Sequence, residues 1–147
     1  MVAYYARFEP DPESDRFFTI TFPDMAWGFS QGEDEQDGRG MALDLLRTML
    51  AEHIRKGDEI PRAKVYRGSR YRQITLPALE AAKVELYRAF RESGMRKTDL
   101  ARALGISKTN IDRLFALNRK SRFDQIEAAF TALGKRVDIE VRDADAA

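Results

Sequence analysis

Apolar and polar residues alternate in two short stretches near the N-terminus, which is the pattern of a β-strand with one buried face. The apolar positions are Tyr4, Ala6 and Phe8 in the first stretch and Phe18, Ile20 and Phe22 in the second. The polar segment 10–15 between them contains two prolines and is typical of a loop. This pattern predicts a β-hairpin, and a third short strand is expected over Ala26 to Ser30.

The apolar spacing changes to three and four residues from Met41 to Ile54, which predicts an amphipathic helix. We expect an acidic loop before it, over Gly32 to Asp37. Two more strands are predicted over Ala63 to Tyr66 and Tyr71 to Leu76, with a turn at Gly68-Ser69. Together these elements predict a small sheet packed on one helix.

Helical spacing dominates the rest of the chain, and Pro77 stands where a second domain would begin. A helix is predicted from there to Gly94, and a last helix follows a capping-box pattern at Ser121 to Asp124. The sequence therefore predicts an α+β protein. Its N-terminal domain would cover residues 1–76, and a C-terminal, all-α domain that ends in one β-strand would cover residues 77–147.

The predicted terminal strand consists of Val137, Ile139 and Val141, which alternate with charged residues. A helical domain offers this strand no partner, and an unpaired strand leaves its amides and carbonyls without hydrogen bonds. We therefore expect the strand to pair with its copy in a second chain, which would make a homodimer, with tetramers as a further possibility. In the alternative, the strand folds back beside Tyr71 to Leu76.

The stretch Lys97 to Leu114, K-T-D-L-A-R-A-L-G-I-S-K-T-N-I-D-R-L, has the spacing of a helix-turn-helix. Ala101 is small enough for two helices to cross closely, Gly105 permits the positive φ of the turn, and Ser107 stands at an N-cap. A plain helical hairpin is the alternative. Residues 95–122 carry eight basic and two acidic groups, however, and this excess attracts a phosphate backbone.

The second helix of this motif would present the polar side chains of its N-terminal half to double-stranded DNA. Asn110 is suited to adenine, and Lys108 and Arg113 are suited to guanine or phosphate. The full set of candidate DNA-binding residues is Lys97, Thr98, Ser107, Lys108, Thr109, Asn110, Arg113, Arg119 and Arg122. A dimer would place two such helices about 34 Å apart, in successive major grooves of an inverted-repeat operator.

Residues 4–61 resemble a known family in the order and spacing of several motifs. These are Y-x-A-x-F-E-P-D-P-E-S-D-R-F-F-T-I-T-F-P-D-M, W-G-F-S-Q-G-E-D, an amphipathic helix and G-D-E-I-P. The pattern is similar to that of the HicB antitoxins. The resemblance implies a sheet packed on a helix, related to part of the ribonuclease H fold without its nuclease activity, and a DNA-binding domain. It also implies a HicA-like ribonuclease toxin as partner and repression of the antitoxin's own operon.

The charge of the N-terminal part is compatible with such a partner, because residues 1–61 hold thirteen acidic and six basic groups. Carboxylates can cover a basic surface that otherwise binds RNA. The candidate toxin-binding residues are Met25, Trp27, Phe29, Glu33, Asp34, Glu35 and Asp37. In the alternative, the acidic loop is merely solvated, and Trp27 by itself is more typical of a core position.

The same sequence argues against several other classes of protein. It contains no cysteine, which excludes disulfides and thiolate metal sites, and no cofactor is expected. It has neither a membrane-spanning apolar run nor a signal-peptide pattern, so we expect a cytoplasmic protein. No strand carries the inward-facing carboxylates of a two-metal nuclease, and the single histidine, His53, is expected to pack at the edge of its helix.

The sequence thus predicts a non-enzymatic antitoxin that inhibits a toxin and represses its own operon. The alternative is a ligand-responsive transcriptional regulator without a toxin partner. That function would require a pocket with convergent polar groups.

Overall fold

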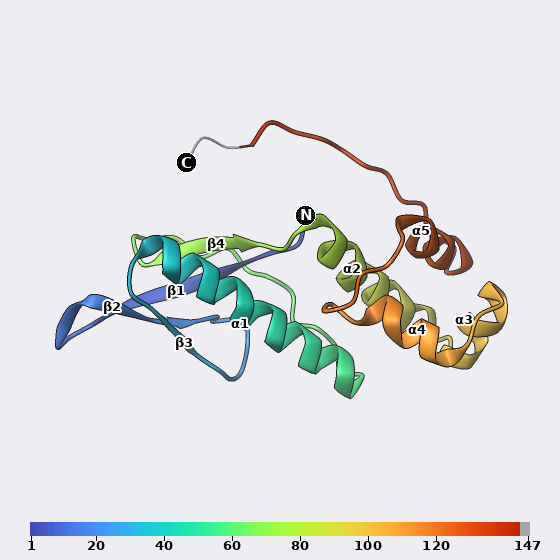
Figure 1. The fold of residues 1–147 in the computed structure, drawn as a ribbon, viewed down its shortest axis with the longest axis horizontal. Coiled ribbons are helices and arrows are strands. Elements are labelled where there is room, and N and C mark those ends of the chain that lie inside the picture. The colour runs from blue at the N-terminus through green and yellow to red at the C-terminus, as the bar shows by residue number, and fades with distance from the viewer. Residues whose placement is uncertain (145–147) are drawn as a thin grey trace.

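The N-terminal half of the protein is an antiparallel sheet with one long helix across one of its faces (Figure 1). The computed structural model describes residues 1–144, with the backbone alone for Asp15. The strands are β1 (Ala3–Asp11), β2 (Ser14–Thr21), β3 (Ser30–Gly32) and β4 (Tyr71–Thr75), in the order β3-β2-β1-β4, and the helix is α1 (Glu35–Lys56).

The predicted alternation of the hairpin is confirmed. Phe8 and Ile20 lie opposite each other in the β1–β2 register, and both are fully buried beneath α1. Leu46 and Leu50 of α1 are buried in the same core. Each such side chain contributes about 1.5–3 kcal/mol when it is fully removed from water, so the contact of sheet and helix is the main stabilisation of this half.

Two boundaries differ from the prediction, those of the third strand and of the long helix. The third strand is Ser30–Gly32 instead of Ala26 to Ser30. Helix α1 begins at Glu35, inside the segment predicted as an acidic loop. The Asp34 carboxylate caps it by accepting a hydrogen bond from the Asp37 amide at 2.8 Å, and acidic groups are favourable at a helix N-terminus.

The predicted strand over Ala63 to Tyr66 is also wrong. The Lys64 amide and the Tyr66 hydroxyl both donate to the Asp24 carboxylate, each at 2.9 Å, so side-chain contacts hold this segment in place of a strand ladder. The second strand of that predicted pair is β4, and it pairs with β1, as in Tyr4 opposite Ile74.

Two glycines allow the start of α1 to pass directly against the end of β3. A Cβ on Gly32 would lie 2.4 Å from the Cα of Gly38, and a Cβ on Gly38 would lie 2.7 Å from the Phe8 ring. Gly40 is different, because a Cβ there would meet no atom of the described residues within 4 Å. The sequence predicted the helix only from about Met41, because glycines weaken a helix locally. The contact of Gly38 with the Phe8 ring cannot be seen in the sequence.

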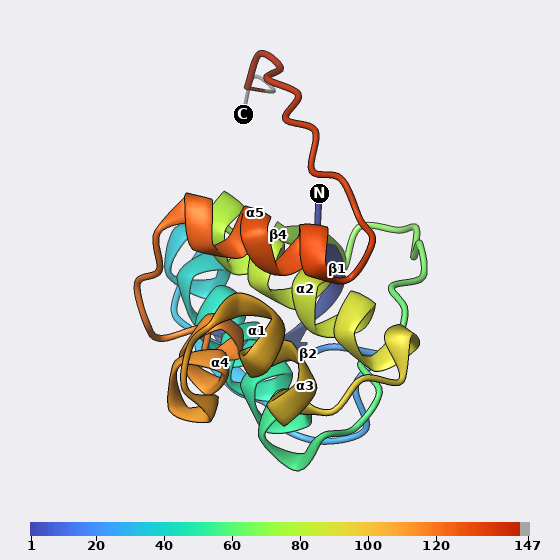
Figure 2. The ribbon, with the colours of Figure 1, turned by 90° about the vertical axis from the view of Figure 1, so that its right-hand side faces the viewer.

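The C-terminal half contains the predicted helices, and three of them surround the first (Figure 2). They are α2 (Ala78–Ser93), α3 (Lys97–Leu104), α4 (Lys108–Phe115) and α5 (Phe123–Ala132). Gly94 and Gly105 end α2 and α3 in the left-handed conformation, with φ of 71° and 65°. The predicted capping box of α5 is wrong. Its N-cap is Arg122, whose side chain makes no capping hydrogen bond to the described residues.

The predicted terminal strand is not formed in the single chain. Residues 135–144 contain no strand, and Ile139 and Val141 are 72% and 90% exposed. The segment extends from α5 away from the other helices, and it does not pair with β4 (Figures 1 and 2). A strand requires a partner for its backbone groups, and one copy offers none to Val137, Ile139 and Val141. Their pairing with a second copy stays a prediction.

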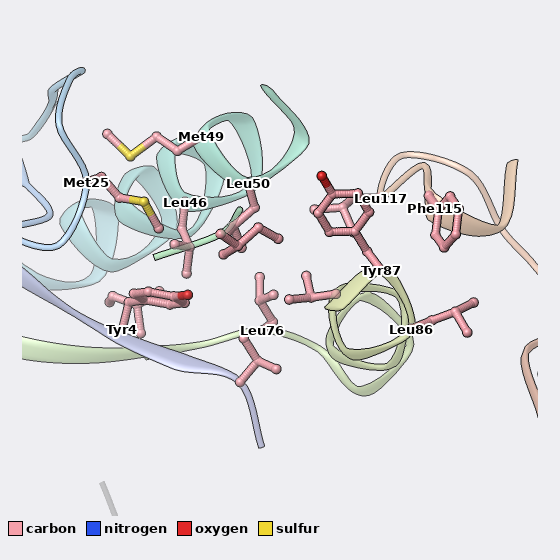
Figure 3. Close-up of a cluster of buried hydrophobic side chains, with 14 of the residues drawn as sticks. Tyr4, Met25, Leu46, Met49, Leu50, Leu76, Leu86, Tyr87, Phe115 and Leu117 are labelled. Atoms are coloured by element: carbon pink, nitrogen blue, oxygen red, sulfur yellow. The ribbon is translucent and has the colours of Figure 1, made fainter. Parts of the chain in front are cut away.

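The hydrophobic core runs from the sheet through α2 to the end of α4 (Figure 3). Tyr87 of α2 contacts residues of both halves of the protein. Its hydroxyl donates to the carbonyl oxygen of Asp58 at 2.6 Å, and its ring meets the Phe115 ring edge-on, with centroids 5.8 Å apart. Helix α2 therefore packs against both halves of the protein.

The glycine pair generates a matched test of the fold. We expect Gly32→Ala to lower the free energy of unfolding by about 1–3 kcal/mol, because the new methyl group collides with backbone atoms of Gly38. Gly40→Ala should raise it by up to about 1 kcal/mol, since alanine is the better helix former and space is free around it. Urea denaturation followed by circular dichroism measures both. Equal effects of the two substitutions would contradict the close contact.

Candidate DNA-binding and partner-binding surfaces

Helices α3 and α4 meet at the turn that the sequence predicts. Ala101 is buried at the crossing, and the Ile106 amide donates to its carbonyl oxygen at 3.0 Å. Ser107 caps α4, because its hydroxyl oxygen accepts from the Asn110 amide at 3.2 Å. Ile111 and Leu114 are buried on the inner side of α4. These contacts fix the two helices as a rigid pair with one outward side.

The candidate DNA-binding residues lie at the surface around this pair. Lys97 is half-buried and forms an ion pair with Asp112 of α4 at 2.7 Å. Arg122 pairs with Asp124 at 2.7 Å. The other candidates are exposed, namely Thr98, Ser107, Lys108, Thr109, Asn110, Arg113 and Arg119. Within residues 1–144, no ion pair includes Lys108, Arg113 or Arg119, so their charges are not neutralised by the protein.

A buried lysine holds the far end of α4, and the sequence analysis missed it. The side chain of Lys83, on α2, is inaccessible to solvent. Its ammonium group donates to the carbonyl oxygens of Arg113, Ala116 and Arg119, at 3.0, 2.8 and 2.6 Å. Burial lowers the pKa of Lys83, and nearby Glu80 acts in the opposite direction.

The signal that could have identified Lys83 is its position. It occupies the apolar stripe of α2, four residues after Leu79 and three before Leu86. A lysine on such a stripe must either extend to the surface or find buried acceptors.

A groove of about 1200 Å³ separates α1 from the end of α4. Its apolar lining includes Ile54, Leu79 and Phe115. Its three carboxylates each have a cation partner in the pairs Arg47–Glu80, Arg55–Glu52 and Lys97–Asp112, at 2.8, 2.6 and 2.7 Å. These carboxylates and their cation partners are therefore engaged with one another, while Asn118, Arg119 and Lys120 also line the groove.

The acidic residues predicted to contact a toxin also build the start of α1. Asp34 and Asp37 act as caps, since the Asp37 carboxylate accepts from the Glu33 amide at 2.9 Å. Glu35 accepts from Arg72 at 2.7 Å and from Arg39 at 3.0 Å, and the Arg72 guanidinium lowers the pKa of Glu35. The Glu33 side chain is exposed, and within residues 1–144 no ion pair includes it. Glu33 is therefore the acidic candidate that the fold leaves most open to a partner.

The aromatic residues before β3 are exposed, which is contrary to the core position that Trp27 by itself suggests. Trp27 and Phe29 are 43% and 69% exposed, whereas Met25 is buried in the core. Gly28 between them lies directly on α1, because a Cβ there would come within 2.8 Å of the Met49 side chain. Met41 of α1 is exposed as well, and the sequence analysis did not identify it as a surface residue. We name Trp27, Phe29 and Met41 the exposed apolar set.

The described residues contain neither a metal-binding cluster nor a membrane-spanning helix. Within residues 1–144 there is no group of three or more histidine, cysteine, aspartate or glutamate side chains that could hold a metal ion. His53 is half-buried on α1, as expected, and both of its ring nitrogens are shielded from solvent without a hydrogen-bond partner among these residues. No helix within the same range has the length and hydropathy needed to cross a membrane.

Comparison with known proteins places the chain in a family. The profile that describes the HicB-like antitoxins of bacterial toxin-antitoxin systems matches residues 3–85. The chain belongs to the HicB-like antitoxin family. The antitoxin is 31% identical over 144 residues to Antitoxin HicB of Pseudomonas fluorescens (strain Pf0-1), a match that covers 98% of this chain and 97% of that protein.

Other relatives agree with this family membership. Antitoxin HicB of Escherichia coli (strain K12) is 30% identical over 136 residues, which are 92% of this antitoxin and 96% of the relative. A solved chain described as a toxin-antitoxin complex from Streptococcus pneumoniae is more distant. It has 17% identity and a TM-score of 0.44, and the match covers 74% of this chain and 92% of that one.

Proposed function

We propose that this antitoxin inhibits a HicA-like, mRNA-cleaving toxin with residues 1–76 and represses its own operon by binding operator DNA, as a dimer, with residues 77–147. The observation that carries the proposal is the pairing of two different surfaces in one chain. A HicB-like half bears exposed aromatic and acidic residues, and a helix pair beside it bears exposed cations that form no ion pair within residues 1–144. On this proposal the chain itself is not an enzyme.

The operator would be read by the outward side of α4. Lys108, Thr109 and Asn110 occupy its exposed first turn, where a recognition helix enters the major groove. Asn110 would bond adenine, and Arg113 would reach guanine or phosphate. Arg119 lies beyond the end of α4 and would bind the phosphate backbone, which fixes the register of the protein on DNA.

The toxin would be bound at the exposed apolar set and Glu33. Large aromatic side chains are the usual anchors of protein interfaces, and carboxylates around them complement a basic partner. Met25 is buried beneath these residues and would support the loop that carries Trp27 and Phe29. Glu35 is neutralised within the protein, so it would contribute less to the interface than its charge suggests.

The terminal segment would complete the assembly. Ile139 and Val141 are exposed in one copy and Val137 is only partly buried against the core, which favours strand pairing between two copies. Such a pairing would bring two recognition helices onto one inverted-repeat operator.

A first test concerns the operator. Arg113→Ala should weaken binding to the promoter of the antitoxin's own operon by about 1–3 kcal/mol, because it removes an unpaired cation from the reading side of α4. A mobility-shift titration measures the affinity, and Lys64→Ala, which removes an exposed cation from the other half, is the control. Toxin inhibition should persist in Arg113→Ala. Its loss together with DNA binding would show that the two roles are not divided between the halves.

A second test concerns the toxin. Phe29→Ala should weaken the complex with the basic protein encoded in the adjacent reading frame by at least about 2 kcal/mol, the effect typical of an aromatic interface anchor. Phe17→Ala is the matched control, because Phe17 is also exposed but lies on β2, outside the exposed apolar set. Calorimetric titration measures both affinities. Failure of the wild-type antitoxin to bind the protein encoded in the adjacent reading frame would reject the proposed inhibition of a toxin.

A third test concerns the dimer. A chain that ends at Gly134 should sediment as a monomer and bind the promoter more weakly, because the segment proposed to pair is gone. A chain that ends at Arg142 keeps the alternating residues and should remain dimeric. Analytical ultracentrifugation distinguishes the two, and a dimer of the shorter chain would place the interface elsewhere.

A further inference from the structure

We propose that Lys83 is the positioning residue of the recognition helix, and that its ammonium group fixes α4 at the angle needed to read a specific DNA sequence. This inference rests on the proposed operator binding. Lys83 itself touches no DNA in this scheme. It acts through the backbone of α4 and of the turn that follows.

The end of α4 differs from the ends of the helices before it. The helices α1, α2 and α3 end at Gly57, Gly94 and Gly105, each in the left-handed conformation that closes a helix. Helix α4 ends at Ala116, with φ of −75° and ψ of 115°, so the chain leaves it in an extended conformation. The Ala116 amide donates to the carbonyls of Asp112 and Arg113, at 3.1 and 3.3 Å, and the other acceptor sites of this last turn are open to donors from elsewhere.

Lys83 supplies those donors from α2. Its three hydrogen bonds reach Arg113 within α4, Ala116 at its cap and Arg119 in the following turn. An ammonium group has three protons, so the three carbonyls satisfy it completely. A cation at this place also interacts favourably with the negative end of the helix dipole.

The same hydrogen bonds hold the backbone of two proposed DNA contacts. The carbonyls of Arg113 and Arg119 are bound to Lys83, while their side chains are exposed. Base readout requires side chains placed to within about 0.5 Å, whereas attraction between cations and phosphates tolerates larger errors. Loss of the ammonium group should therefore reduce sequence preference more than general affinity for DNA.

Helix α2 is in turn fixed to the toxin-binding half. Glu80, one turn before Lys83, accepts a bifurcated hydrogen bond from the Nε–H of Arg47 on α1, with its two carboxylate oxygens at 2.8 and 3.0 Å. Lys83 thus ties α4 to a helix that is itself anchored on α1. A leucine at position 83 would suit the apolar stripe but would remove the Lys83 donor of the Arg119 carbonyl. It would also leave the Arg113 and Ala116 carbonyls with only the amides of Ala116 and Arg119, at 3.3 and 3.2 Å.

The experiment compares two duplexes of equal length, the promoter fragment of the antitoxin's own operon and a scrambled sequence. Lys83→Met should reduce affinity for the promoter at least tenfold and change affinity for the scrambled duplex by less than twofold. The salt dependence of binding should be unchanged, since no phosphate contact is removed. Lys83→Gln keeps two donors and should give an intermediate loss, and Lys64→Met is the control for removal of a lysine charge.

The readouts separate a positioning role from a merely structural one. Binding of the adjacent-frame protein and the thermal unfolding curve report on the fold of each variant. Equal losses on both duplexes, or no loss on either, would overturn the role of Lys83. If Lys83→Met does not fold, the ratio of the two affinities of Lys83→Gln, for the promoter and for the scrambled duplex, decides instead. A wild-type protein without preference for its promoter would reject the proposed operator binding itself, and this inference with it.

Discussion

The burial of α2 on two sides is the constraint on which the rest of the structure depends. One turn of the helix carries Glu80, which is bound to α1, and the next carries Lys83, which is bound to the end of α4. Farther along, Tyr87 reaches the loop after α1 with its hydroxyl and Phe115 with its ring. Neither half could keep its present position if this helix moved, because both pack on it.

The polar groups buried around α2 make this arrangement specific as well as stable. Apolar contacts alone are non-directional and would allow α2 to slide or rotate between its neighbours. The Lys83 ammonium and the Tyr87 hydroxyl allow only one position of α2 along and around its axis. In any other position these donors would lose their carbonyl partners and remain unsatisfied. The polar positions along the helix therefore determine how the two halves face each other.

Local patterns predicted much of the fold, because their causes are local. Period-two alternation identified β1 and β2, and Gly94 and Gly105 marked the ends of helices through their left-handed backbone. The errors arose where distant residues decide the outcome. The start of α1 depends on the contact of Gly38 with the Phe8 ring, and the buried Lys83 depends on carbonyls some thirty residues away.

The candidate surfaces were predicted less completely, because ion pairs between residues far apart in the sequence change which charges are available. The turn of the helix pair and the exposure of its cations follow from the motif between Lys97 and Leu114. The acidic character of the other half was overestimated by counting residues 1–61 alone, because residues 62–76 add five basic groups and no acidic ones. Two of them, Arg70 and Arg72, pair with Glu9 and Glu35. Residues 1–76 together therefore hold thirteen acidic and eleven basic groups, which is close to balance.

Helix α2, on which both halves pack, limits how such a protein can exchange its C-terminal half during evolution. The family profile extends to residue 85, within α2, and so includes Glu80, which contacts α1, but not Tyr87, which contacts the loop after α1. A different C-terminal module spliced in at Pro77 would have to recreate Glu80 and Tyr87 from its own sequence, opposite Arg47 and Asp58 of the retained half. A crossover inside α2, after the residues that contact α1, would preserve those contacts and leave only the opposite side of the helix to be rebuilt.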